Sequence, residues 1–171
     1  MLEDAPMTAQ DALVALMIAM SASDEQIRTA ELVKMSNAIN NLPVFAGYDA
    51  ERLPRMSKLV FELLEQVDGL EALFGLIRDA LPEHLYETAY ALSCDVAAAD
   101  GRIAGQEARM LEEIRDELEL ARLHAAAIER GARARHMTLY DAAFSASCHD
   151  HMCISCDRRH GAGPKYALKI L

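Results

Sequence analysis

The sequence predicts an all-α protein, a compact bundle of about seven helices. Three observations support this fold class. Alanine, leucine, methionine and glutamate dominate the composition, and all four residue types favour helix. Apolar residues recur at three- and four-residue spacing over most of residues 8–136. Finally, no segment shows the two-residue alternation that is typical of a half-buried strand.

The first two helices are bounded by ordinary start and stop signals. The first is predicted to begin behind Thr8, because threonine is a good N-cap, and its apolar residues continue to Met20. The second follows Asp24. It ends near Asn41, because the proline at position 43 cannot continue a helix.

The remaining helices follow from turn residues and apolar periodicity. A third helix has Pro54 in its first turn, and a fourth begins after the turn Asp68-Gly69. Pro82 is expected in the first turn of a fifth helix, whose broadly apolar surface is typical of a central element. The last two helices are predicted over residues 104–118 and 121–135.

Length and charge limit the classes of function. A chain of 171 residues is long enough for one domain with a real core. Its formal net charge of −10 argues against nucleic acid as a partner, because phosphate binding needs an excess of lysine and arginine. The first ten residues are acidic and lack the basic region of a signal peptide, and the longest apolar run, residues 12–20, is too short to span a membrane. We therefore expect a cytoplasmic protein without a transmembrane segment, with its cysteines reduced or bound to metal.

A short pattern occurs twice in the chain. The stretches AMSASDEQIRTAE and DVAAADGRIAGQE align at an offset of 76 residues, which places Asp24 on Asp100 and Glu31 on Glu107. The apolar positions that flank the two stretches correspond as well. The sequence therefore predicts an internal repeat, in which two pseudo-symmetric units each consist of a helix, an Asp-containing turn and a second helix.

The repeated pattern points to a metal site. Its form D-G-x-I-x-x-x-E is the second half of an EF-hand loop, but the positions that would supply the first ligands hold methionine, valine or alanine. If the two turns face each other across a pseudo-twofold axis, the carboxylates of Asp24, Glu31, Asp100 and Glu107 converge. Four close carboxylates need a cation or protons to neutralise them, and ligands that are all oxygen favour Ca²⁺, Mg²⁺ or Mn²⁺.

A purely structural interpretation of the same residues stands beside the metal site. Aspartate is common in connections between helices, and glutamate in a first helical turn complements the helix dipole. The first copy also has Glu25 where the second has Gly101, which weakens the argument from the turn. A duplicated helical hairpin would then be a scaffold for protein–protein interaction, with an acidic face and no metal.

The chain resembles the tellurite-resistance TerB family. The resemblance covers residues 8–136 and rests on ALVALMIAMSASDEQIRTAEL, LPEHLYETAYALSCDVAAADGRIAGQE and AAAIERGARAR. It implies an all-helical, pseudo-symmetric domain with a metal site built from the acidic residues of both repeats, which on this chain are Asp24, Glu31, Asp100 and Glu107. It also implies a non-enzymatic role in bacterial tellurite resistance and stress response, beside membrane-associated protein partners.

The segment after residue 137 differs from the rest, so we divide the chain into a helical domain, residues 1–137, and a tail, residues 138–171, that we expect to be flexible. The tail holds three of the four cysteines and three of the six histidines, and nothing in it matches the TerB resemblance. Four of its residues are the candidate ligands of a Zn²⁺ ion: Cys148, His151, Cys153 and Cys156. Their crowding within a few residues disfavours zinc and favours an oxidisable, unstructured segment.

The other reactive residues have simpler explanations. Cys94 lies on the apolar fifth helix, where a small buried hydrophobe is expected. A cluster of arginines around Arg130 and Arg133 at the end of the last helix offsets the helix dipole, with docking to an acidic partner or a lipid headgroup as the alternative. The chain has no glycine-rich phosphate loop, no G-x-S-x-G and no H-E-x-x-H, so we expect it not to be an enzyme.

Overall fold

The structure, a computed structural model, describes residues 6–23, 29–99, 103 and 105–137. These residues form seven α-helices, three short 3₁₀ turns and no strand, which confirms the predicted all-α fold. The helices are α1 (Ala9–Ala22), α2 (Thr29–Asn41), α3 (Leu53–Leu64), α4 (Gly69–Ala80), α5 (Tyr86–Ala97), α6 (Gly105–Glu117) and α7 (Arg122–Arg135). The 3₁₀ turns are Pro43–Phe45, Ala50–Arg52 and Glu83–Leu85. All of these elements belong to one unit, Met1–Thr138.

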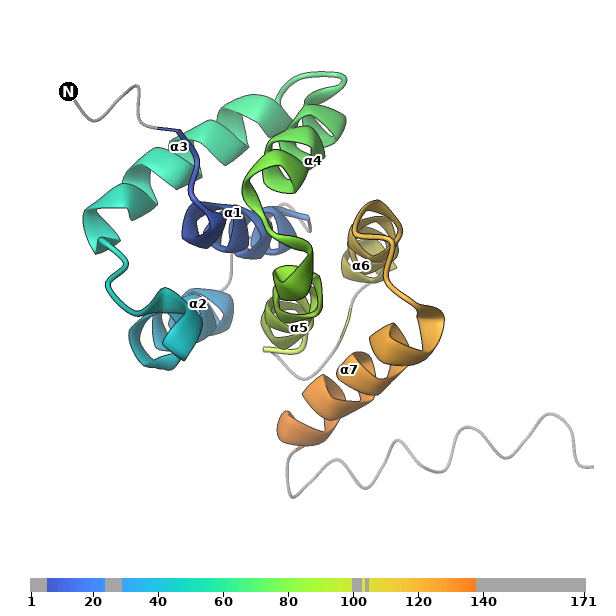
Figure 1. Cartoon of the computed structure of the whole chain (residues 1–171). Coiled ribbons are helices and arrows are strands. Elements are labelled where there is room, and N and C mark those ends of the chain that lie inside the picture. Colours follow the sequence, from blue (N-terminus) through green and yellow to red (C-terminus); the bar gives the residue numbers. More distant parts are fainter. Residues whose placement is uncertain (1–5, 24–28, 100–102, 104, 138–171) are drawn as a thin grey trace, which may run out of the picture. The chain divides into compact units, whose positions relative to one another are not determined.

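Helix α1 lies in the middle of the bundle (Figure 1). Every residue from Asp11 to Ser21 is buried, so the helix is covered on all sides. It packs against α3 and α4 on one side and against α2, α5 and α6 on the other. The helix begins as predicted, because the Thr8 hydroxyl accepts a hydrogen bond from the backbone N–H of Asp11.

Helix α5 is the second central element. It contacts α1, α2, α6 and α7, and its buried residues include Tyr90, Leu92 and Val96. The Tyr90 ring is buried, while its hydroxyl donates a hydrogen bond of 2.7 Å to Oε1 of Glu129 on α7. The core of the domain therefore forms around the packed pair α1 and α5.

Helices α3 and α4 form a tight hairpin that covers one side of α1. Their buried residues Met56, Val60, Leu73 and Ile77 face the core. The turn between the two helices brings Gly69 against the backbone of α3. A Cβ atom added to Gly69 would lie 1.6 Å from the carbonyl oxygen of Leu63, so only glycine fits this position.

Helices α2 and α6 correspond closely in position along the chain. Both have 13 residues, and the bounds of α6 are those of α2 displaced by 76 residues. Each of the two helices contacts both α1 and α5, and the aligned residues Met35 and Leu111 are both buried. The correspondence ends just after the helices, because Leu42 is 40% exposed whereas the aligned Leu118 is 2% exposed.

One detail of the sequence interpretation is wrong. Pro82 does not lie inside a fifth α-helix: its extended backbone (ψ 143°) precedes the turn Glu83–Leu85, and α5 begins only at Tyr86. None of the helices in the described part of the chain is long and apolar enough to cross a membrane.

Candidate functional site

The two glutamates of the repeated pattern occupy equivalent positions. Glu31 is the third residue of α2, and Glu107 is the third residue of α6. Both are 2% exposed, although glutamate is seldom buried unless it has a partner. Each takes part in at least one hydrogen-bonding or electrostatic interaction. Their place in a first helical turn also sets the negative charge at the positive end of the helix dipole.

The two aspartates of the pattern, Asp24 and Asp100, lie outside the described residues, so the convergence of four carboxylates stays a prediction. Within the ranges that the structure describes, no group of three or more histidine, cysteine, aspartate or glutamate side chains is arranged to hold a metal ion. The candidate zinc ligands of the tail, all beyond residue 137, are likewise outside these ranges.

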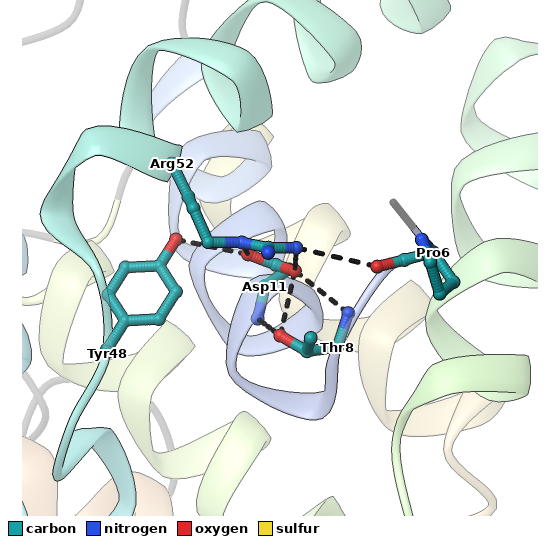
Figure 2. A network of polar contacts seen from close by, with 5 residues as sticks. All are labelled: Pro6, Thr8, Asp11, Tyr48 and Arg52. Carbon is teal, nitrogen blue, oxygen red and sulfur yellow. Dashed lines mark hydrogen bonds and ion pairs between the residues drawn. The ribbon is translucent and has the colours of Figure 1, made fainter. Parts of the chain in front are cut away.

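The best-defined polar cluster of the domain was not found from the sequence. The fully buried carboxylate of Asp11 lies under the guanidinium of Arg52, with 2.5 Å from Nη2 to Oδ2 and 3.0 Å from Nε to Oδ1 (Figure 2). The backbone N–H and the hydroxyl of Thr8 also donate to this carboxylate, each at 2.8 Å. The Tyr48 hydroxyl donates at 3.3 Å, and Arg52 reaches the carbonyl oxygen of Pro6.

This cluster joins the start of α1 to the segment that leads into α3. Burial alone raises the pKa of Asp11, but the hydrogen bonds from Arg52 and Thr8 outweigh it, so this pKa lies below its ordinary value. Burial and the Asp11 charge raise the pKa of Tyr48. Asp11 therefore stays ionised and Tyr48 neutral near pH 7, which suits a structural role. The Thr-x-x-Asp spacing was the available signal, since it marks a capping box.

A cleft of about 510 Å³ opens between α2, α5 and the end of α7. Its polar residues include Lys34, Asp95, Arg135 and His136. Arg135 binds Asp95 at 2.6 Å, and His136 lies 3.6 Å from the same carboxylate. Burial, together with the charge of Lys34, lowers the pKa of His136 despite the nearby Asp95, so the imidazole is neutral at pH 7. The salt bridge fixes the end of α7 on α5.

Cys94 is buried as expected and is 1% exposed. Burial, followed by the charges of Glu129 and Asp95, raises the pKa of its thiol to about 12. Because the thiolate is the reactive form, we expect Cys94 to resist iodoacetamide at pH 8 in the folded protein and to react fully in denaturant. Peptide mapping by mass spectrometry measures this. Rapid modification of Cys94 in the folded protein would contradict the buried position.

These features define a class of protein: an acidic, all-helical domain built on two central helices, with a buried glutamate at the third position of α2 and of α6. Residues 10–130 match the family described as Tellurite resistance protein TerB. The match covers most of the chain, which therefore belongs to the TerB family, as the resemblance had indicated. Membership implies a role related to tellurite resistance. Comparison with curated proteins and with solved structures produced no match.

Proposed function

We propose that this TerB domain is a non-enzymatic module of tellurite resistance and stress response that binds one divalent cation. The ligands would be Asp24, Glu31, Asp100 and Glu107. One observation carries the proposal: the two glutamates of the aligned patterns are both almost fully buried, each in the first turn of its helix. Conversion of binding into a signal would involve protein partners, among them membrane-associated components of the same response.

The physical argument concerns the cost of burying charge. Removing a carboxylate from water costs several kcal/mol even after the protein relaxes, so a buried glutamate needs compensation. The helix dipole typically stabilises a negative charge in the first helical turn by about 1 kcal/mol or less, which is smaller than the cost of burying the carboxylate. Glu31 and Glu107 each take part in at least one other hydrogen-bonding or electrostatic interaction as well. A hard divalent cation would add to this compensation, and oxygen ligands select Ca²⁺, Mg²⁺ or Mn²⁺ over Zn²⁺. The internal repeat gives the reason for two such glutamates, because each repeat would contribute half of the ligands.

Thermal unfolding of the full chain tests the metal site. A ligand that binds only the folded state stabilises it by about 2.7 kcal/mol at a hundredfold excess over its Kd, which raises the Tm by several degrees. We expect such a rise with at least one of Ca²⁺, Mg²⁺ and Mn²⁺ after treatment with chelator, and a return to the original Tm when chelator is added again. Calorimetry with the same three cations gives the stoichiometry, which should be one ion per chain.

Matched variants separate a specific site from general screening of an acidic protein. Glu31→Gln with Glu107→Gln should abolish the rise in Tm. The control is Glu71→Gln with Glu87→Gln, which changes two exposed first-turn glutamates of α4 and α5 and should leave the rise intact. A Tm that ignores all three cations, or that responds equally in both double variants, leaves the domain as a scaffold without metal.

A further inference from the structure

The solvent-exposed side of α7 has an unusual composition. Arg122, Ala126, Arg130, Arg133 and Met137 recur at spacings of four, four, three and four residues, so they lie along one face of the helix. Leu123 borders this face and is 80% exposed, and Met137 just beyond its end is 58% exposed. We call these six residues the arginine face of α7. It contains three arginines, three apolar residues and no acidic residue.

An adjacent side of α7 attaches the helix to the domain. Ala125 and Ala132 are buried against α5, and α7 lies at the edge of the bundle (Figure 1). The one acidic residue of the helix, Glu129, accepts the hydrogen bond from Tyr90, is half-buried, and lies between this inner side and the arginine face. The three arginines of the face are themselves exposed.

The arginines of this face differ from two other arginines of the domain, Arg78 and Arg135. Arg78 is paired with Glu117, and Arg135 is paired with Asp95. In contrast, Arg122, Arg130 and Arg133 make no ion pair or side-chain hydrogen bond with any residue that the structure describes. Three guanidinium groups on one helix face, each without a partner among the described residues, are an exception on a chain whose net charge is −10. Such a local field attracts carboxylates.

We propose that the arginine face of α7 is a docking surface for an acidic helix of a partner protein. Guanidinium groups bind carboxylates through two parallel hydrogen bonds, and three of them spaced along a helix match glutamates at the same spacing on a second helix. Ala126, between Arg122 and Arg130, leaves room for the close approach of another backbone. Leu123 and Met137 supply apolar contacts near the two ends.

A lipid bilayer fits this surface less well than a protein helix does. An amphipathic helix that binds membranes inserts a broad row of large apolar side chains, whereas the arginine face offers only Leu123 and Met137. The excess of negative charge on the rest of the chain is also repelled by anionic lipid headgroups. An acidic helix needs complementary charges only along the arginine face itself, so a protein helix is the better match for this surface.

Fluorescence anisotropy with a defined probe tests the proposal. The probe is a labelled, end-capped helical peptide with glutamates at every third or fourth position on one face and leucine and alanine beside them. We expect the full chain to bind this peptide, and Arg122→Glu with Arg130→Glu and Arg133→Glu to weaken binding about tenfold or more. Raising the salt from 0.05 to 0.5 M should weaken binding by the wild-type chain as well.

The controls separate the arginine face from general attraction between charges. Lys58→Glu with Arg109→Glu reverses two exposed cations on α3 and α6 and should leave binding within about twofold. A peptide of the same composition with its glutamates distributed around the helix should bind as weakly as the triple variant binds the original probe. Equal binding by the triple variant and the wild type overturns the proposal. So does binding of the wild type to phosphatidylglycerol vesicles in preference to the peptide.

Discussion

Replacing Asp11 with alanine should lower the free energy of unfolding by about 3 kcal/mol, one of the two largest single-residue effects that we expect in this domain. The substitution removes the acceptor of four hydrogen-bonding groups at the start of α1, on Thr8, Tyr48 and Arg52. It also leaves the Arg52 charge without its partner. Arg52 keeps some access to solvent, which places the loss at the lower end of the range of about 3–5 kcal/mol for a broken buried pair.

Urea unfolding of the full chain measures this loss. The control is Glu62→Ala, which breaks an exposed ion pair with Lys58 of 3.8 Å and should cost less than about 0.5 kcal/mol. The double variant Asp11→Ala with Arg52→Ala should recover part of the loss, because no unpaired charge remains. A loss below about 1 kcal/mol for Asp11→Ala would show that the cluster does not stabilise the fold.

The same cluster makes stability depend on pH in a definite direction. The folded-state pKa of Asp11 lies below the unfolded value of 3.8, so the unfolded state binds a proton first as the pH falls. The contribution of Asp11 is therefore complete above about pH 5 and is lost as the pH falls below 3.8 and through the folded-state pKa. In the Asp11→Asn variant, the urea concentration at the midpoint of unfolding should change less between about pH 5 and pH 2 than it does in the wild type.

Replacing Gly69 with alanine should cost about 3 kcal/mol. The added Cβ would lie 1.6 Å from the carbonyl oxygen and 2.5 Å from the carbonyl carbon of Leu63, and backbone atoms cannot move aside as a flexible side chain can. The α3–α4 hairpin would have to open, which would disturb the packing of both helices on α1. The change in urea midpoint measures this cost.

Gly75 provides a matched control in the same helix. Apart from the neighbouring backbone of α4 itself, nothing lies within 4 Å of a Cβ added there, so Gly75→Ala introduces no clash. Alanine also lowers the conformational entropy of the unfolded chain, and we expect a gain of about 0.5–1 kcal/mol. Opposite signs for the two substitutions would confirm the close approach at Gly69, whereas similar small effects would contradict it.

The fold was predictable because its signals are local. Thr8 as a cap, proline near the start of α3 and the turn at Asp68-Gly69 each act within a few residues of the chain, and the structure has helices that begin at or beside them. Pro82 shows the limit of such signals. Its ring is compatible both with a first helical turn and with the residue before a turn, and the structure has the second arrangement.

Of the four predicted metal ligands, the structure describes only the two glutamates. The alignment of the two stretches identified Glu31 and Glu107, and these side chains are buried in equivalent turns. Sequence spacing cannot place two carboxylates 76 residues apart relative to one another, because their separation depends on how the helices cross. The convergence with Asp24 and Asp100 thus stays a prediction that the metal titration tests.

The sequence by itself determined the helical class, the succession of helices, the family and the pair of aligned glutamates. These properties follow from periodicity, capping residues and motif spacing, which are short-range. Only the packing of the helices decides that Asp11 meets Arg52, 41 residues further along the chain, and that Leu42 is exposed while Leu118 is buried. The same holds for the three exposed arginines of α7, which have no partner among the residues that the structure describes. The reason is that burial and pairing depend on which helix faces come together, and that choice is made by packing of the whole core.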